Sequence, residues 1–192
     1  MPEPMPEVLA FLQTRRSRPA KTLKMPVSER EEIASLLKMA ARAPDHKKLE
    51  PWRFIVLAKP ALTRLAPLCE ARYDALGLPA EKREKICAQF RDGLLAVAVI
   101  AAPKPREDVP EVEQILSAGA VCLALLNAAL ASGWGANWLS GPMAFDRGFL
   151  SEGLGLAPDE FVAGFIHIAS ESSPPPERPR PDMARITQWV ES

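Results

Sequence analysis

Three arginines surround one serine in the segment Arg15-Arg16-Ser17-Arg18. A guanidinium group offers planar N–H donors that suit phosphate oxygens, and a serine hydroxyl adds a further donor. The segment therefore has the chemistry to hold a phosphate group. A solvated basic turn explains the same residues, and the spacing alone favours that turn.

A second polar segment, Arg42 to Lys48, precedes Pro51-Trp52 and contains His46. It is expected between a helix and a buried strand, where loops commonly hold ligands. An ordinary turn with an exposed histidine is the alternative. The other histidine, His167, lies within an apolar strand pattern and is expected to be a core histidine whose hydrogen bonds are satisfied.

Two glycines flank a tryptophan in Gly133-Trp134-Gly135. The pair lacks the third glycine and the preceding strand of a dinucleotide-binding fingerprint. Gly133 is better explained as the residue that ends a helix. The sequence carries no paired carboxylates, nucleophile elbow, P-loop or metal-ligand cluster, so either the chain is no enzyme or a bound cofactor carries its reaction.

Hydrophobic periodicity and proline positions predict the elements that must position these residues. One expected helix begins at the caps Ser28 and Glu31 and ends before Pro44. The other expected helices cover residues 6–14, 61–76, 80–91, 111–132 and about 145–153. Expected strands cover 52–58, 94–102, 136–140, 161–169 and 186–190.

The composition is that of one globular domain of 192 residues with a formal net charge of zero. The missing bulk charge disfavours a general nucleic-acid or membrane binder. The apolar stretch 115–131 is near the roughly 17 residues that span a membrane, but it is rich in alanine and carries Ser117 and Asn127. A core helix that packs against a second subunit is expected instead. The three cysteines, with no C-x-x-C pair, and the acidic N-terminus fit a cytoplasmic protein without a secretory signal.

Taken in order, the motifs resemble one family. They are R-R-S at 15–17, R-A-P-D-H-x-x-x-x-P-W-R-F at 42–54, a long alanine-rich helix, G-x-G, and S-G at 140–141. This order resembles the nitroreductase family of FMN-dependent flavoproteins, and most closely its short bacterial NAD(P)H nitroreductases. The resemblance implies an α+β fold with a mostly antiparallel sheet flanked by helices. It also implies an intertwined homodimer with FMN at the interface. Residues 1–192 would form one flavin-binding domain, with a flexible 1–6 and a proline-rich arm, 174–192, exchanged between subunits.

The same resemblance implies the site residues. Arg15, Arg16 and Ser17 would hold the FMN phosphate and ribityl end, and Arg42 and His46 would reach the flavin from the partner subunit. Leu139, Ser140 and Gly141 would line the other side of that FMN. A NAD(P) contact would fall on Ala129, Leu130, Ala131, Ser132, Gly133 and Trp134. No side chain would be catalytic, since flavin N5 carries the chemistry, and no metal is expected.

One departure concerns Leu139, where close relatives often have arginine; Arg178 or Arg180 would replace that charge. The implied activity takes hydride from NAD(P)H and reduces nitroaromatic, quinone or similar acceptors in a ping-pong cycle. Alternatives are dehalogenation, enone reduction or flavin breakdown on the same scaffold, or a non-catalytic flavin carrier or redox sensor. A Cys122/His167 hydrolase is the weakest alternative.

Overall fold

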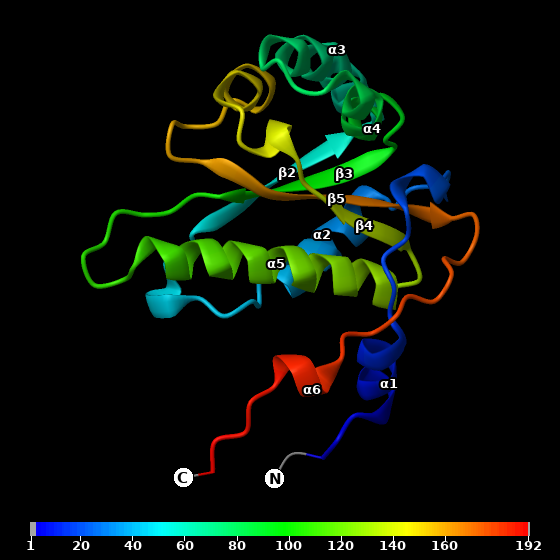
Figure 1. Cartoon of the computed structure of the whole chain (residues 1–192), viewed down its shortest axis with the longest axis vertical. Coiled ribbons are helices and arrows are strands. Elements are labelled where there is room, and N and C mark those ends of the chain that lie inside the picture. Colours follow the sequence, from blue (N-terminus) through cyan, green and yellow to red (C-terminus); the bar gives the residue numbers. More distant parts are fainter. Residues whose placement is uncertain (1–2, 192) are drawn as a thin grey trace.

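Five antiparallel strands form one sheet through the middle of the molecule (Figure 1), in a computed structural model that describes residues 3–191. The strand order is β1 (Leu23–Lys24), β5 (Phe161–Glu171), β3 (Leu95–Ala101) and β2 (Trp52–Ala58), and β4 (Gly135–Leu139) also pairs with β5. All seven residues of β3 are buried, as expected for an unbroken apolar run between Gly93 and Pro103. β5 is therefore the strand on which β1, β3 and β4 meet.

Two helices cover each face of the sheet (Figure 1). α3 (Lys59–Ala75) and α4 (Ala80–Arg91) lie on one face, and α2 (Arg30–Ala40) and α5 (Glu111–Ala131) lie on the other. Each face of the sheet has its own hydrophobic core, and alternate residues of β3 pack into one or the other. Ala98 packs with α3 and α4, and Val97 packs with α2 and α5.

α5 is the one helix within residues 3–191 that is long and apolar enough to cross a membrane. Its inner side is buried in the core with β3 and α2, which is typical of a core helix in a soluble protein.

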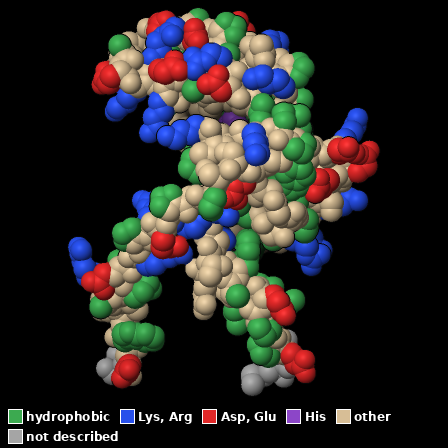
Figure 2. All heavy atoms as spheres, turned by 90° about the vertical axis from the view of Figure 1, so that its right-hand side faces the viewer, with side chains coloured by type: hydrophobic (Ala, Val, Ile, Leu, Met, Phe, Trp, Pro, Cys, Tyr) green, Lys and Arg blue, Asp and Glu red, His purple; other side chains and the backbone are tan. Residues whose placement is uncertain are grey.

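α1 (Pro6–Thr14) and α6 (Met183–Ile186) extend away from the sheet (Figure 1). None of the α1 residues is buried, and large apolar side chains on both segments face solvent, among them Leu9, Ile186 and Trp189. Figure 2 shows hydrophobic groups along both projecting segments. Short turns complete the chain: η1 (Ala20–Thr22), η2 (His46–Lys48), η3 (Pro142–Ala144) and the π-helical η4 (Phe149–Gly153).

The structure confirms the α+β class with its antiparallel sheet and corrects two local expectations. Ser28 does not cap α2, because the Oγ of Ser28 is buried without a partner and Glu29 precedes the helix. Residues 186–190 form no strand in the described chain; Ile186 ends α6 and the segment that follows has no regular structure. α6 projects away from the sheet of its own chain (Figure 1), so pairing of this segment with the sheet of a partner subunit stays a prediction. Of the expected flexible N-terminus, residues 1–2 lie outside the described residues.

Candidate functional site

The arginine segment lies against the first residues of β4. The backbone N–H of Arg18 donates to Ala136 O at 2.8 Å. The side-chain amide of Asn137 donates to Arg18 O at 2.7 Å. The chain from Arg15 to Ser17 is therefore fixed beside the strand that leads to Leu139.

Four arginines gather at this point: Arg15, Arg16, Arg18 and Arg180. Arg16 Nη1 donates to Pro176 O at 2.5 Å, and Arg18 Nε donates to Glu171 Oε2 at 2.6 Å. Burial lowers the pKa of Arg15, and the nearby charge of Arg180 lowers it further, ahead of Arg16 and Arg18. The cluster therefore holds more positive charge than its carboxylates offset. Arg180, rather than Arg178, stands beside Arg15.

Arg15 is the member of this cluster that lacks an acidic partner among the described residues. Its Nη2 donates to Ser17 Oγ at 3.2 Å, and its Nε is buried with no hydrogen-bond partner in residues 3–191. A buried, unpaired donor in an excess of positive charge is a fitting site for an anion such as phosphate.

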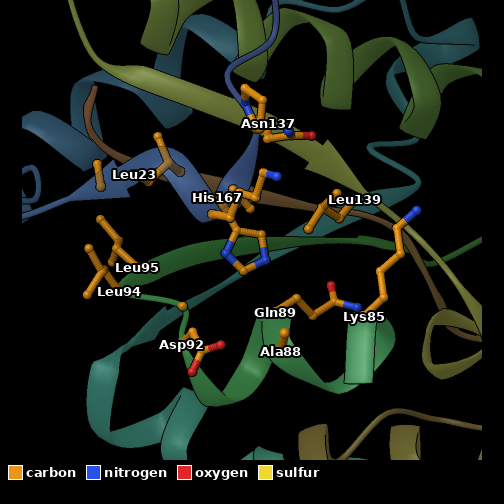
Figure 3. Close-up of a pocket in the computed structure, with 15 residues that line it drawn as sticks. Leu23, Lys85, Ala88, Gln89, Asp92, Leu94, Leu95, Asn137, Leu139 and His167 are labelled. Atoms are coloured by element: carbon orange, nitrogen blue, oxygen red, sulfur yellow. The ribbon is translucent and has the colours of Figure 1, made fainter. Parts of the chain in front are cut away.

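A cavity of about 510 Å³ opens beside this cluster, between α4, β4, β5 and residues 19–23 (Figure 3). Leu139 lines it, so the cavity adjoins the expected flavin-binding segment. Its polar lining consists of residues that the sequence did not single out for this role: Lys21, Lys85, Gln89, Asp92, Asn137 and His167. On the charged helix 80–91 nothing in the sequence distinguishes Gln89 from its exposed neighbours.

Two of these side chains are buried with an unpaired polar atom. His167 is 2% exposed and its Nε2 has no partner among the described residues; Gln89 is 7% exposed and its Oε1 has none. Burial lowers the pKa of His167 to about 4, so its ring is neutral at physiological pH. The expectation of a core histidine is correct for burial but wrong for hydrogen bonding. The cavity leaves one ring nitrogen unsatisfied.

Ser140 and Gly141 follow β4 at the rim of the same region. Gly141 has φ +143°, a conformation that L side chains rarely adopt. A Cβ built there would lie 3.4 Å from Ile86 Cδ1 on α4, so the backbone passes close to that helix. Residues 139–141 thus lie at the end of β4, close to α4, and their contact with FMN stays a prediction.

Arg42 and His46 lie elsewhere in the chain. His46 Nδ1 is 2.7 Å from Glu113 Oε2, in the first turn of α5, whereas the arginine segment contacts β4 beyond the last turn of that helix. The 21 residues of α5 separate these ends by about 30 Å, because a helix rises about 1.5 Å per residue. Within one chain His46 therefore lies at the end of α5 that is remote from the arginine segment, and a contact of Arg42 and His46 with a partner subunit's flavin stays a prediction.

The loop after His46 is strained. Lys47, Lys48 and Glu50 have positive φ values of 58°, 53° and 49°. Such conformations cost roughly 1 kcal/mol or more for residues with a side chain, and they concentrate at functional sites. The Asp45 carboxylate secures the loop by accepting a hydrogen bond from Glu50 N at 2.6 Å.

Residues 129–134 end α5 in a Schellman turn. Trp134 N donates to Ala129 O at 3.0 Å and Gly133 N donates to Leu130 O at 3.1 Å, with Gly133 at φ +85°. The Trp134 indole donates to Glu32 Oε1 at 2.7 Å. This confirms the helix-ending role of Gly133, and none of the six residues lines the 510 Å³ cavity. A NAD(P) contact at 129–134 stays a prediction.

An apolar groove of about 470 Å³ lies on the outer side of α5. Leu116, Leu123, Trp138 and Phe145 line it and are all exposed. A Cβ built on Gly119, also in the groove, would meet nothing within 4 Å. The groove is large and apolar enough to receive another protein surface.

The sequence and the fold both match known proteins. The model of the family described as "Nitroreductase family" matches residues 12–170. The chain is 31% identical over 165 residues to the Escherichia coli K12 protein named "Putative NAD(P)H nitroreductase YdjA", covering 85% of this chain and 88% of that protein. A Haemophilus influenzae protein described as a "Putative NAD(P)H nitroreductase" is 35% identical over the same length and coverage.

Solved structures share the fold at lower identity. A nitroreductase-like family protein from Bacillus cereus superimposes with a TM-score of 0.79 at 22% identity, covering 96% of each chain. A nitroreductase with bound FMN from Bacteroides fragilis gives a TM-score of 0.72 at 18% identity, covering 96% of this chain and 99% of that one.

Proposed function

Because the chain belongs to the nitroreductase family, we propose that it is an FMN-dependent oxidoreductase that takes a hydride from NAD(P)H and reduces a nitroaromatic, quinone or similar acceptor. The observation that carries the proposal is the buried, unpaired Nε of Arg15 within the four-arginine cluster. A phosphate monoester supplies the negative charge and the acceptor oxygens that this cluster lacks.

The residues present fit FMN. Arg15, Arg16 and Ser17 would hold the phosphate and ribityl end, with Arg180 adding the charge that Leu139 does not supply. Residues 139–141 would line the flavin, next to the 510 Å³ cavity. When bound, FMN would supply two-electron redox chemistry between NAD(P)H and the second substrate. The protein's part is to position the ring, exclude water and supply hydrogen-bond donors and acceptors.

A second copy of the chain would complete the site. Arg42 and His46 would reach the flavin of the partner subunit, which fits the position of His46 at the end of α5 that is remote from the arginine segment. The groove on α5 and the exposed apolar side chains of α1 and α6 would be covered in the dimer, and the arm 174–192 would cross to the partner. We place this enzyme in the cytoplasm, where its buried free thiols stay reduced.

Flavin binding tests the proposal most directly. Purified protein is freed of cofactor, titrated with FMN and followed by flavin absorbance and fluorescence. NADH and NADPH oxidation is then measured with quinone and nitroaromatic acceptors. Tight FMN binding with NAD(P)H oxidation is expected. Failure to bind FMN would refute the proposal, and binding without NAD(P)H oxidation would identify a flavin carrier instead.

The dimer has its own test. Leu123→Glu places a charge in the apolar groove and is expected to reduce the dimer to monomer in light scattering after size exclusion. Leu76→Glu is the control, because Leu76 is equally exposed (43% against 44%) but lies at the end of α3 outside the groove. A wild-type monomer that binds FMN normally would contradict the shared site.

A further inference from the structure

The two unpaired polar atoms of the cavity have complementary hydrogen-bonding capacities. Gln89 Nε2 donates to Ile86 O at 3.1 Å, which fixes the amide and leaves Oε1 as a free acceptor. A neutral imidazole can present an N–H at Nε2, so His167 can act as a donor. Native proteins rarely leave such buried atoms unpaired unless a ligand or a water completes them.

Both side chains line one cavity, which lies next to the four-arginine cluster. Figure 3 shows the ring of His167, from β5, pointing toward α4, from which Gln89 and Lys85 extend. Asn137 lines the same cavity and its side-chain amide donates to Arg18 O, so the cavity lies next to the arginine segment. A ligand with its phosphate at Arg15 would therefore have its ring system within reach of the cavity.

The remaining lining suits a flat aromatic ring. Ala88, Leu94 and Leu139 present apolar surface, which favours the faces of such a ring, while the polar atoms are few. The pyrimidine edge of a flavin carries a carbonyl, the N3–H and a second carbonyl in sequence. One acceptor and one donor that line the same cavity suit an edge on which an N–H lies next to a carbonyl.

We propose that Gln89 and His167 bind the pyrimidine edge of the flavin, with Gln89 Oε1 accepting from N3–H and His167 Nε2–H donating to a neighbouring carbonyl. This inference rests on the proposed FMN binding. It adds two cofactor-binding residues that sit on α4 and β5, outside the segments 15–17 and 139–141.

The test compares FMN with N3-methyl-FMN, which lacks the N3–H. Dissociation constants are measured by fluorescence quenching for the wild type, Gln89→Leu and Lys82→Leu. Lys82 is the control because it lies on α4 but is exposed outside the cavity. Loss of a buried hydrogen bond is expected to weaken FMN binding about 5- to 20-fold in Gln89→Leu, with Lys82→Leu unchanged.

Methylation of N3 should weaken wild-type binding by a similar factor and have little further effect in Gln89→Leu. The wild-type comparison needs no variant, so a misfolded Gln89→Leu protein leaves the test intact. For His167, the readout is the absorption spectrum of bound flavin, which His167→Phe should shift because the hydrogen bond to a carbonyl is lost.

Wild-type protein that binds both flavins equally would overturn the role of Gln89 while leaving the proposed function standing. An unchanged flavin spectrum in His167→Phe would overturn the role of His167 in the same way. Wild-type protein that binds neither flavin would overturn both the inference and the proposed function.

Discussion

Replacing Arg15 by methionine should affect the free protein and the FMN complex in opposite directions. In the free protein Arg15 contributes a buried Nε without a partner and a charge that faces three other arginines. In the complex the same group would pair with phosphate. Methionine keeps much of the aliphatic volume and removes only the guanidinium, so Arg15→Met separates these two effects.

The magnitudes follow from the contacts. Removing an unpaired buried donor gains about 1–3 kcal/mol, and losing the 3.2 Å hydrogen bond to Ser17 Oγ costs about 0.5–1.5 kcal/mol. The net change in the free energy of unfolding of the cofactor-free protein should therefore lie between a loss of about 0.5 kcal/mol and a gain of about 2.5 kcal/mol, so the variant should be about as stable as the wild type or more stable. Losing a charged hydrogen bond to phosphate costs about 1.5–3 kcal/mol, which weakens FMN binding about 10- to 150-fold.

Two assays measure the two effects: urea unfolding of the cofactor-free protein and FMN titration by fluorescence. Arg83→Met is the matched control. Arg83 Nε pairs with Asp74 Oδ1 at 2.8 Å, and this hydrogen bond raises the pKa of Arg83. Loss of this ion pair in Arg83→Met should slightly reduce the stability of the protein and leave FMN affinity unchanged. Arg15→Met should instead keep the stability and weaken FMN binding. An Arg15→Met protein that is clearly less stable without FMN, yet binds FMN within twofold of the wild type, would refute the phosphate role.

Three further results are expected. Asp146→Asn should cost about 2 kcal/mol at pH 7, because the Asp146 side chain is only 6% exposed and accepts from Arg72 Nε at 2.7 Å. The Arg72 hydrogen bond lowers the pKa of Asp146, so this contribution is present at neutral pH and lost as pH falls through the folded-state pKa; acid unfolding that is identical in the two proteins would contradict it. Gly164→Ala should cost about 1–3 kcal/mol in thermal unfolding, because the new Cβ would lie 2.7 Å from Trp138 Cδ1; unchanged stability would show that the indole moves freely. Burial raises the pKa of the Cys122 thiol to about 12, so Cys122 should resist a thiol reagent at pH 8 until the protein unfolds, and rapid labelling of the native protein would contradict this.

Elements with a self-contained pattern were predicted well from the sequence. The helix 80–91 matches α4 residue for residue, and the run 94–102 contains β3, because apolar periodicity and flanking proline or glycine define such elements locally. β1 was not predicted, since a two-residue strand has no periodicity and exists only because residues 170 and 171 of β5 pair with it.

For the candidate site, too, the sequence was informative at some residues and not at others. Motif order singled out Arg15, Ser17 and Gly141 as candidate FMN-binding residues, because the role expected of them depends on residue type. Gln89 was missed because its burial results from the packing of α4 over β5, and one polar residue on a charged helix carries no signal of that packing. For His167 the apolar strand pattern predicted burial, but whether a buried nitrogen finds a partner depends on side chains distant in sequence.

The central position of β5 has a consequence for synthesis of the protein on the ribosome. β1, β2, β3 and β4 all precede β5 in the chain, yet β1, β3 and β4 pair with β5. Until residues 161–171 emerge, the nascent chain has no strand that joins these elements, and the contacts of Arg16 with Pro176 and Glu177 form later still. At translation rates of about 5–20 residues per second, the earlier strands wait with unpaired edges for several seconds. The sheet therefore closes in one late step, and the four-arginine cluster is assembled only after it.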